Sequence, residues 1–200
     1  MAEAQPDDVM TLVYTSGTTG PPKGAMLTND NFSFCVEQII NVDGRLPGNR
    51  KAGPEDQILT YLPLCHVAER IFSAWHLASQ GTVLNFAESI DTVQQNLREI
   101  QPTLFFAVPR IWEKIHATIF IKGRDATWFK RLWFGLGMKA ASVIGRERVD
   151  NGGLDTPLSR VLNWIFYPLV FRALRERIGL RRVRWAGTGA AAIAPEVIQD

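Results

Sequence analysis

The sequence predicts an α/β fold with a largely parallel sheet flanked by helices, and three observations lead to it. Short apolar runs rich in strand-forming residues alternate with longer segments whose apolar residues recur at helical spacing. Glycine, proline or polar clusters separate most of these segments. With 200 residues, 46% of them hydrophobic and 21% charged, the chain is long enough for one sizeable core. Strands that alternate with helices are typical of parallel sheets, because each parallel crossover needs a long connection.

The N-terminal quarter contains one strand and one helix in this interpretation. Val9–Thr15 is rich in strand formers and predicts a buried strand. Hydroxyls, glycines and prolines at 16–24 predict a loop, after which an apolar run resumes. The polar cluster at 28–31 offers N-caps for a helix through about Ile40, and residues 43–56 predict a turn-rich loop.

The rest of the chain continues the alternation. Further strands are predicted at 58–62, 82–86, 103–108 and 183–186. Helices are predicted at 68–79, 90–100, 109–120, 127–144 and 158–178. Pro195, at a first helical position, opens a last helix.

Charge and cysteine content narrow the class of protein. A formal net charge of +2 gives no global field for nucleic acid, so nucleic-acid binding is not expected. Cys35 and Cys65 make neither a disulfide framework nor a metal-ligand spacing, and we interpret them as reduced core thiols of a cytosolic protein. The acidic N-terminus is unlike a secretory signal. The longest apolar run, 164–171, is broken by Pro168 and is too short to span a bilayer. A cytoplasmic location is therefore expected.

The loop at residues 14–24 is the most informative segment. Gly17 and Gly20 allow left-handed backbone angles and close approach to phosphate oxygens. Lys23 adds a flexible positive charge suited to a polyphosphate. The Ser16 hydroxyl is a candidate magnesium ligand, because Mg²⁺ prefers oxygen ligands shared with substrate phosphates. The hydroxyl side chains that lie beside backbone N–H groups in this loop are those of Thr15, Ser16, Thr18 and Thr19.

The residues of this loop also admit two interpretations other than the phosphate loop proposed above. A Walker phosphate loop is disfavoured, because Pro22 stands directly before Lys23 and the required glycine–lysine–hydroxyl ending is missing. A glycine-rich turn without a ligand is the second alternative.

The full segment, Tyr-Thr-Ser-Gly-Thr-Thr-Gly-Pro-Pro-Lys-Gly, resembles the signature phosphate loop of the adenylate-forming (AMP-binding) superfamily. That superfamily includes acyl-CoA synthetases, peptide-synthetase adenylation domains and luciferases. The resemblance implies that Thr15 to Gly20 and Lys23 bind the β- and γ-phosphates of ATP.

Three further segments resemble the same superfamily in the same order. Residues 62–70 (Leu-Pro-Leu-Cys-His-Val-Ala-Glu-Arg) imply a catalytic role for His66 near the acyl carboxylate. His76 and His116 have no such context and are interpreted as structural. Residues 107–115 are typical of the long-chain fatty acyl-CoA synthetase branch. The small-residue loop within 185–196 implies contacts with the nucleotide base and the acyl chain, through Gly187, Thr188, Gly189, Ala190 and Ala191.

The resemblance implies an ATP-dependent long-chain fatty acid:CoA ligase that uses Mg²⁺ and coenzyme A. The 200 residues match only the middle of the family's large N-terminal domain, with a helical insert at about 113–180. The C-terminal domain that carries the catalytic lysine is not matched, so the chain alone is expected to be inactive. A fatty acyl-AMP ligase, the adenylation region of a carboxylic acid reductase and a non-catalytic truncated binding module remain alternatives.

Aromatic residues stand beside basic ones in the helical insert. Beside Lys130 and Arg131 stand Trp128, Phe129, Leu132, Trp133 and Phe134. This pattern fits peripheral contact with an anionic membrane, where lipid substrates partition. The pattern favours the alternative slightly more, which is a core-facing helix with a solvated basic side. The sequence does not decide the oligomeric state or the acyl chain length.

Overall fold

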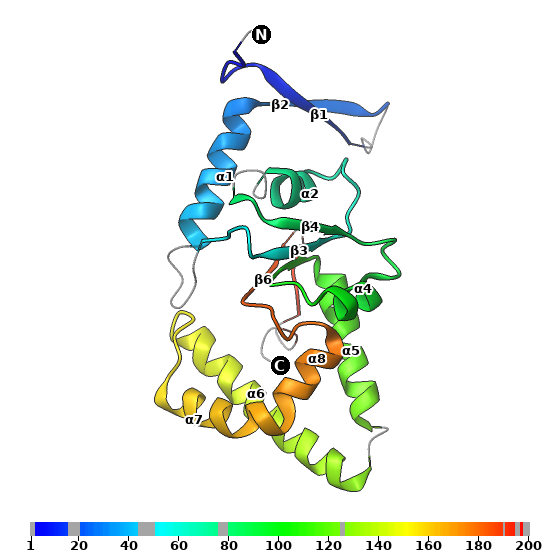
Figure 1. Cartoon of the computed structure of the whole chain (residues 1–200), viewed down its shortest axis with the longest axis vertical. Coiled ribbons are helices and arrows are strands. Elements are labelled where there is room, and N and C mark those ends of the chain that lie inside the picture. The colour runs from blue at the N-terminus through cyan, green and yellow to red at the C-terminus, as the bar shows by residue number, and fades with distance from the viewer. Residues whose placement is uncertain are drawn as a thin grey trace. The chain divides into compact units, whose positions relative to one another are not determined.

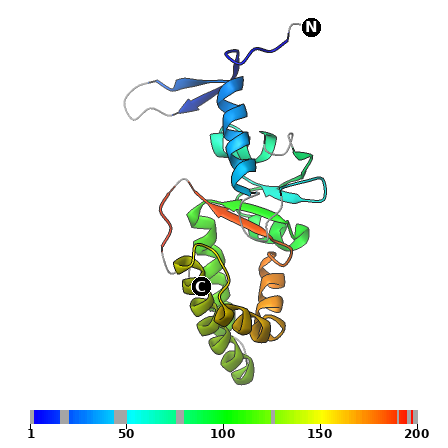
Figure 2. The same ribbon diagram turned by 90° about the vertical axis from the view of Figure 1, so that its left-hand side faces the viewer.

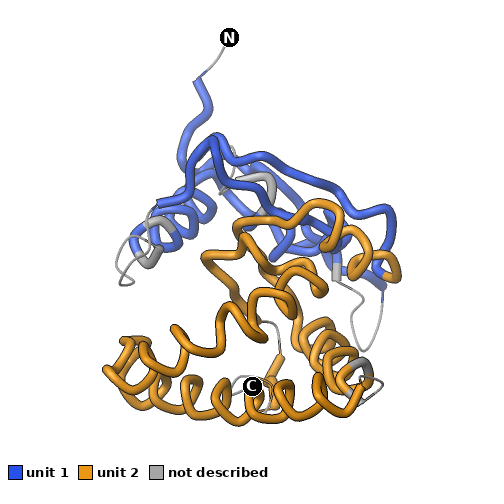
Figure 3. Tube along the Cα trace, turned by 60° about the horizontal axis from the view of Figure 1, so that its bottom comes forward, with its two compact units in different colours: residues 1–90 blue, residues 91–200 orange. Residues whose placement is uncertain are grey.

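A computed structural model describes residues 3–15, 21–43, 51–75, 80–124, 127–189, 191–194 and 197. The chain divides into two compact units, Met1–Ile90 and Asp91–Asp200, which are coloured separately in Figure 3. Each unit holds a parallel strand pair with helices (Figure 1). The predicted α/β class with parallel pairing is therefore confirmed.

The first unit begins with an antiparallel hairpin and a helix. Its elements are β1 (Val9–Thr15), β2 (Lys23–Thr28) and α1 (Asn29–Asp43). The predicted strand at Val9–Thr15 exists, but the prediction that it is buried was wrong. Val9, Met10, Leu12 and Tyr14 are exposed, and Val13 alone is buried among the side chains described in this strand. The reason is that β1 pairs with β2 in a two-stranded sheet, which leaves most of its side chains in contact with solvent.

Polar residues cap α1, as the sequence predicts. The Asn31 backbone N–H donates to Thr28 Oγ1 (3.3 Å), and the Thr28 N–H donates to Asn31 Oδ1 (3.1 Å). The segment before β1 contributes as well, because the Asp30 N–H donates to the carbonyl of Pro6 (2.9 Å). Figure 2 shows the hairpin at the N-terminal end of α1, where these bonds hold it.

The second half of this unit is a parallel strand pair with a short helical segment. The elements are β3 (Gln57–Thr60), α2 (Val67–Glu69), η1 (Arg70–Trp75) and β4 (Val83–Phe86). Ile58, Leu59 and Phe32 supply buried apolar side chains. The predicted helix at 68–79 begins one residue earlier and changes to π-helical geometry from Arg70, and residues 76–79 lie outside the described part. Cys65 is exposed, so its interpretation as a core thiol was wrong: it lies in the loop after β3.

The second unit packs helices against another parallel strand pair. The strands are β5 (Leu104–Ala107) and β6 (Trp185–Thr188), in register from Leu104↔Trp185 to Ala107↔Thr188. The helices are α4 (Val93–Ile100), α5 (Pro109–Arg124), α6 (Trp128–Asp150), α7 (Pro157–Phe166), the π-helix η2 (Tyr167–Phe171) and α8 (Arg172–Ile178). Val93, Leu97, Leu104, Phe105 and Ile115 form its apolar centre. None of the described helices has the length and hydropathy needed to cross a membrane.

One predicted helix, 158–178, is divided in the structure. Regular helix ends at Phe166, and η2 carries Pro168 before α8 begins. Proline has no N–H and its ring collides with the preceding turn, so a wider π turn accommodates it. The helix predicted at 127–144 instead continues to Asp150 and lies beside α7 (Figure 1, Figure 2). The helix predicted at Pro195 lies outside the described residues.

The C-terminal ends of α4 and α8 meet at a glycine. Gly179 ends α8 with φ +84°, and a Cβ there would overlap the backbone carbonyl group of Leu97. Gln101, which follows α4, donates from Nε2 to the Glu176 carbonyl (3.1 Å) and accepts from the Arg181 N–H (3.1 Å) at Oε1. Backbone contact and hydrogen bonds therefore join the two helices directly.

Gly179→Ala tests this contact against Gly152→Ala. Gly152 also has positive φ (+62°), but nothing lies within 4 Å of its Cβ position. We expect Gly152→Ala to cost about 1–2 kcal/mol of unfolding free energy from backbone strain. Gly179→Ala is expected to cost a further ~1–3 kcal/mol, because overlap adds to strain. Urea unfolding measures both, and equal losses in the two variants would contradict the proposed contact.

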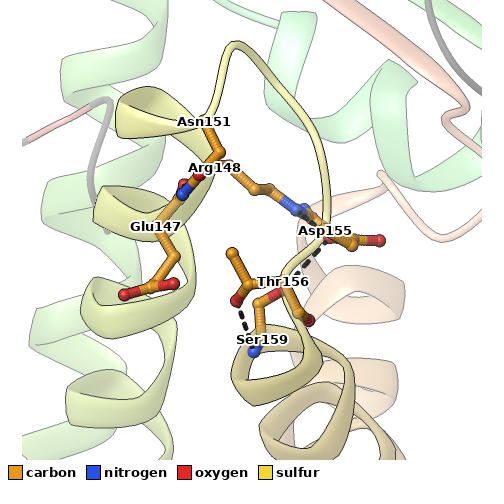
Figure 4. Close-up of polar contacts among 6 residues, drawn as sticks. All are labelled: Glu147, Arg148, Asn151, Asp155, Thr156 and Ser159. Atoms are coloured by element: carbon orange, nitrogen blue, oxygen red, sulfur yellow. Dashed lines mark hydrogen bonds and ion pairs between the residues drawn. The ribbon is translucent and has the colours of Figure 1, made fainter.

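An ion pair and a helix cap hold the turn between α6 and α7 (Figure 4). Arg148 Nε lies 2.7 Å from Asp155 Oδ1. Thr156 caps α7, since the Ser159 N–H donates to its Oγ1 (3.1 Å). The hydrogen bond from Arg148 is the main cause that lowers the pKa of Asp155 below its ordinary value of 3.8, and burial opposes it.

The lowered pKa of Asp155 predicts a pH-dependent contribution to stability. A carboxyl whose folded pKa is depressed stabilises the fold above its unfolded pKa, and this contribution is lost as pH falls through the folded value. Both side chains are more than a third exposed, so we expect Asp155→Asn to cost less than about 1 kcal/mol at pH 7. The difference from wild type should narrow below pH 3.8 in urea unfolding. A gap of constant size from pH 7 to pH 3 would contradict the ion pair's role.

Candidate functional site

The strand register of the hairpin places the two ends of the predicted phosphate loop opposite each other. Thr15 pairs with Lys23, and Tyr14 pairs with Gly24. Residues 16–22 therefore connect two paired strands. Lys23 is exposed where β2 begins, at the base of this connection. Ser16, Gly17, Thr18, Thr19 and Gly20 lie outside the described residues, as does the Thr15 side chain, so their predicted phosphate contacts stay predictions.

Tyr14 and Gly24 stabilise the base of the hairpin. A Cβ at Gly24 would stand 3.2 Å from the Tyr14 ring, which is closer than ordinary van der Waals contact. The ring thus packs on the glycine backbone across the two strands. Glycine at this position allows the close packing, because any larger residue would crowd the Tyr14 ring.

His66 caps the short helix α2 with its side chain. Its backbone is extended (φ −82°, ψ 126°), and its Nδ1 accepts a hydrogen bond from the Ala68 N–H (3.2 Å). In a neutral ring with Nδ1 as acceptor, Nε2 carries the proton. The ring is exposed. The cap therefore fixes the ring through Nδ1 and leaves Nε2 outside this bond.

A buried carboxylate holds the loop that carries His66. Glu69 is only 6% exposed, and its Oε2 accepts a hydrogen bond from the Leu62 N–H (3.0 Å). The His66 N–H donates to the Pro63 carbonyl (2.8 Å), which closes the same turn. Sequence reasoning missed Glu69. Glu69 stands three residues after the cap, which is the spacing of a capping-box acid, and this spacing could have indicated a role in holding the turn. In the structure its bond goes to the Leu62 N–H instead of the N-cap N–H.

A tryptophan hydrogen-bonds to strand β6. The prediction that Gly187 and Thr188 belong to a loop was wrong, because both lie in β6 and pair with Phe106 and Ala107. Trp112 donates from its indole Nε1 to the Gly187 carbonyl (3.3 Å), and its ring packs edge-on against Phe105 at 5.2 Å. A Cβ at Gly189 would stand 3.3 Å from the Phe106 ring. Trp112, in a segment that the sequence marks only as typical of the long-chain branch, therefore bonds to the strand that precedes Gly189.

The remaining predicted residues have the following places. Thr188 is exposed at the end of β6, and Ala191 is exposed beyond it. Ala190 lies outside the described residues, as does His76. The His116 ring packs against the Phe120 ring at a tilt of 52°, with ring centroids 4.7 Å apart, which agrees with its interpretation as structural.

The described residues form no metal-binding cluster: no three of their His, Cys, Asp or Glu side chains gather to hold a metal ion. The predicted magnesium ligand Ser16 is outside that range. Within the first unit, Lys23 is an exposed cation at the base of the hairpin, and the exposed His66 ring lies at the start of α2.

Two relatives are similar to nearly all of this chain. The chain is 34% identical over 196 residues to the putative fatty-acid–CoA ligase fadD11 of Mycobacterium tuberculosis, covering 97% of this chain and 33% of the relative. It is 32% identical over 213 residues to the long-chain-fatty-acid–CoA ligase ACSBG2 of Xenopus laevis, covering 100% of this chain and 26% of that protein. The chain thus spans about a third or a quarter of these relatives' length.

A solved structure shares the fold. The A domain of the carboxylic acid reductase from Segniliparus rugosus, in complex with AMP and a co-purified carboxylic acid, matches with a TM-score of 0.56 at 25% identity. The match covers 98% of this chain and 25% of that one. The family described as AMP-binding enzyme matches residues 1–200, the whole sequence. The chain belongs to the AMP-binding enzyme family.

Proposed function

We propose that this chain is the ATP-handling part of an AMP-forming long-chain fatty acid:CoA ligase. The observation that carries the proposal is the hairpin register, which pairs Thr15 with Lys23 at the base of the family's phosphate loop. The relatives at 32–34% identity, described as fatty-acid–CoA ligases, support the substrate class. The relatives are three to four times longer than the matched segment, and we propose that turnover also requires parts outside it.

The proposed reaction has two steps. A carboxylate oxygen attacks the α-phosphorus of ATP, the bond to the β-phosphate breaks, and pyrophosphate leaves. The CoA thiol then loses its proton and attacks the acyl carbonyl, and AMP leaves. The first step brings two anions together, so charge neutralisation and positioning are what the protein must supply.

The residues of this chain have separate roles in that scheme. Lys23 neutralises the polyphosphate, and the Nε2–H of His66 orients the acyl carboxylate. The segment at Gly187, Thr188 and Gly189 provides a backbone surface for the base and the acyl chain. Mg²⁺, when bound, would neutralise phosphate charge through oxygen ligands, and Ser16 remains its candidate ligand on this chain.

Lys23→Ala tests the phosphate role against Lys51→Ala. Lys51 is another exposed lysine of the first unit that lies outside the hairpin. Loss of one hydrogen bond to a charged phosphate costs about 1.5–3 kcal/mol, so we expect Mg·ATP to bind roughly 10- to 100-fold more weakly to Lys23→Ala. Binding of AMP, which lacks the β- and γ-phosphates, should change little. Isothermal titration calorimetry measures both ligands, and equal weakening in the two lysine variants would exclude Lys23 from the site.

Glu69 is expected to act as a positioning residue for His66. Glu69→Ala leaves the Leu62 N–H without its carboxylate, which we expect to cost about 1–3 kcal/mol of unfolding free energy. The ring resonances of His66 should shift in NMR spectra, and Glu69→Gln, which keeps an acceptor oxygen, should restore both values in large part. Glu88→Ala, an exposed carboxylate of the same unit, is the control. Unchanged His66 resonances in Glu69→Ala would show that Glu69 serves stability alone.

The adenylation region of a carboxylic acid reductase is a second candidate function. The match to the Segniliparus rugosus A domain favours it. Both candidates form an acyl-adenylate, and they differ in the acceptor of the acyl group. Acyl transfer to CoA by the complete protein would support the ligase, and an adenylate that CoA does not discharge would support the second candidate.

We propose a cytoplasmic protein that contacts membranes peripherally. Trp128 is 77% exposed, and Phe129 and Leu132 are exposed beside Lys130 and Arg131. Exposed aromatic residues among basic ones favour an anionic lipid surface. The exposure of Trp128 and Leu132 supports this alternative, whereas Trp133 and Phe134 of the same helix are half-buried.

A further inference from the structure

The second unit contains a cavity of about 470 Å³ that none of the predicted catalytic or nucleotide-binding residues lines. Its walls come from α4, α5, α6, η2 and α8. A volume of this size lies within the roughly 300–1,000 Å³ range of small-molecule sites in proteins. The cavity is therefore large enough for a ligand and separate from the loops assigned to the adenylation chemistry.

Apolar side chains form most of the cavity wall. They come from helices that are far apart in the sequence, and the main ones are Ile115, Ile119, Trp133, Phe134, Leu174 and Ile178. The polar side chain of Thr118 is engaged internally, because its Oγ1 donates to the Lys114 carbonyl (2.7 Å) and accepts from Gln94 Nε2 (3.4 Å). The interior thus suits a hydrocarbon chain rather than a polar ligand.

Three cations also line the cavity. Arg98 is on α4, Lys130 on α6 and Arg177 on α8, and the lining residues that the structure describes include no Asp or Glu. Arg98 is held in part by its Nε bond to the Gln94 carbonyl (3.0 Å). An apolar interior with these three cations around it is complementary to an anion that carries an alkyl chain.

Glycines at helix contacts fix the cavity walls. A Cβ at Gly123 of α5 would overlap the Phe134 ring of α6. A Cβ at Gly137 of α6 would stand 2.8 Å from Val170 of η2. With the contact of Gly179 on α4, these glycines let the five helical elements around the cavity approach closely, so its shape is built into their packing.

We propose that this cavity binds the alkyl chain of a single-chain anionic amphiphile, with the anionic head at Arg98, Lys130 and Arg177. The inference does not depend on ATP binding or on the proposed ligase function. The chemistry recognised is one flexible hydrocarbon chain and one negative head. Free fatty acids and single-chain membrane lipids both have it, and the experiment separates these sources.

The test uses laurate, octanoate and dodecyltrimethylammonium, each below its micelle concentration, titrated calorimetrically into the 200-residue chain. We expect one laurate per chain. Affinity should rise by about fourfold for each added methylene from octanoate to laurate, the ratio that corresponds to burial of a methylene group. The cationic dodecyl compound should bind at least tenfold more weakly than laurate.

Two matched pairs of variants assign the binding to the cavity. Ala173 lines the cavity, whereas Ala117 is an exposed alanine of α5 that does not. Ala173→Trp should weaken laurate binding at least tenfold by filling the space, and Ala117→Trp should not. Lys130→Met should weaken laurate but leave the cationic compound unchanged or tighter, with Lys139→Met, also exposed on α6, as its control. The lysine pair tests the proposal even where Ala173→Trp fails to fold.

Several outcomes would overturn the proposal. One is equal affinity for the anionic and cationic twelve-carbon compounds. Another is equal loss in both members of each variant pair. Binding to vesicles of anionic phospholipid without binding of monomeric laurate would place the lipid on the exposed surface of α6 instead. Laurate binding to monomeric protein that vesicles do not compete for would support a free fatty acid as the source.

Discussion

Backbone polar groups at the ends of the strands must find partners once the sheet ladder stops, and the rest of the structure depends on how they do so. The Leu62 N–H, beyond β3, bonds to the buried carboxylate of Glu69. The Gly187 carbonyl, in β6, accepts from the Trp112 indole. A buried donor without a partner costs about 1–3 kcal/mol, so these bonds are strongly favoured. Because the same segments carry His66 and Gly187, satisfaction of the backbone also positions the candidate functional groups.

The helix α8 connects two features of the second unit. One face supplies Leu174 and Ile178 to the apolar cavity. From the same helix, Arg175 donates to the carbonyls of Leu180 (3.2 Å) and Val183 (2.6 Å), which lead into β6. The contact of Gly179 with α4 fixes the end of the helix. A change in the packing of α8 would therefore reach both the cavity wall and the strand that carries Gly187, within one unit.

Local sequence patterns predicted the elements well, because alternation of apolar residues, prolines at helix starts and polar caps act over a few residues. The cap at Thr28 and the helix begun by Pro109 are examples. Patterns failed where the exposure or geometry of an element depends on more than its own sequence. β1 is exposed because β2 is its only partner strand in a two-stranded sheet. The helix is divided at Pro168 because a π-helical turn accommodates the proline.

The candidate site was predictable as a motif but not as a set of contacts. The composition of residues 14–24 indicated phosphate binding. That Thr15 lies opposite Lys23 could not be predicted from composition, because it depends on how β1 and β2 pair in the hairpin. The roles of Glu69 and Trp112 depend on side chains that cross from one element to another, which spacing alone does not reveal. The cavity is lined by residues of α4, α5, α6, η2 and α8, so no single segment of the sequence predicts it.

Amide hydrogen exchange in the presence of Mg·ATP, compared with AMP, tests most directly whether the hairpin is a phosphate-binding element. We expect slower exchange in residues 14–24 with Mg·ATP and little change there with AMP, since the loop is assigned to the β- and γ-phosphates. Exchange in that segment that is unaffected by Mg·ATP, or slowed equally by AMP, would contradict it.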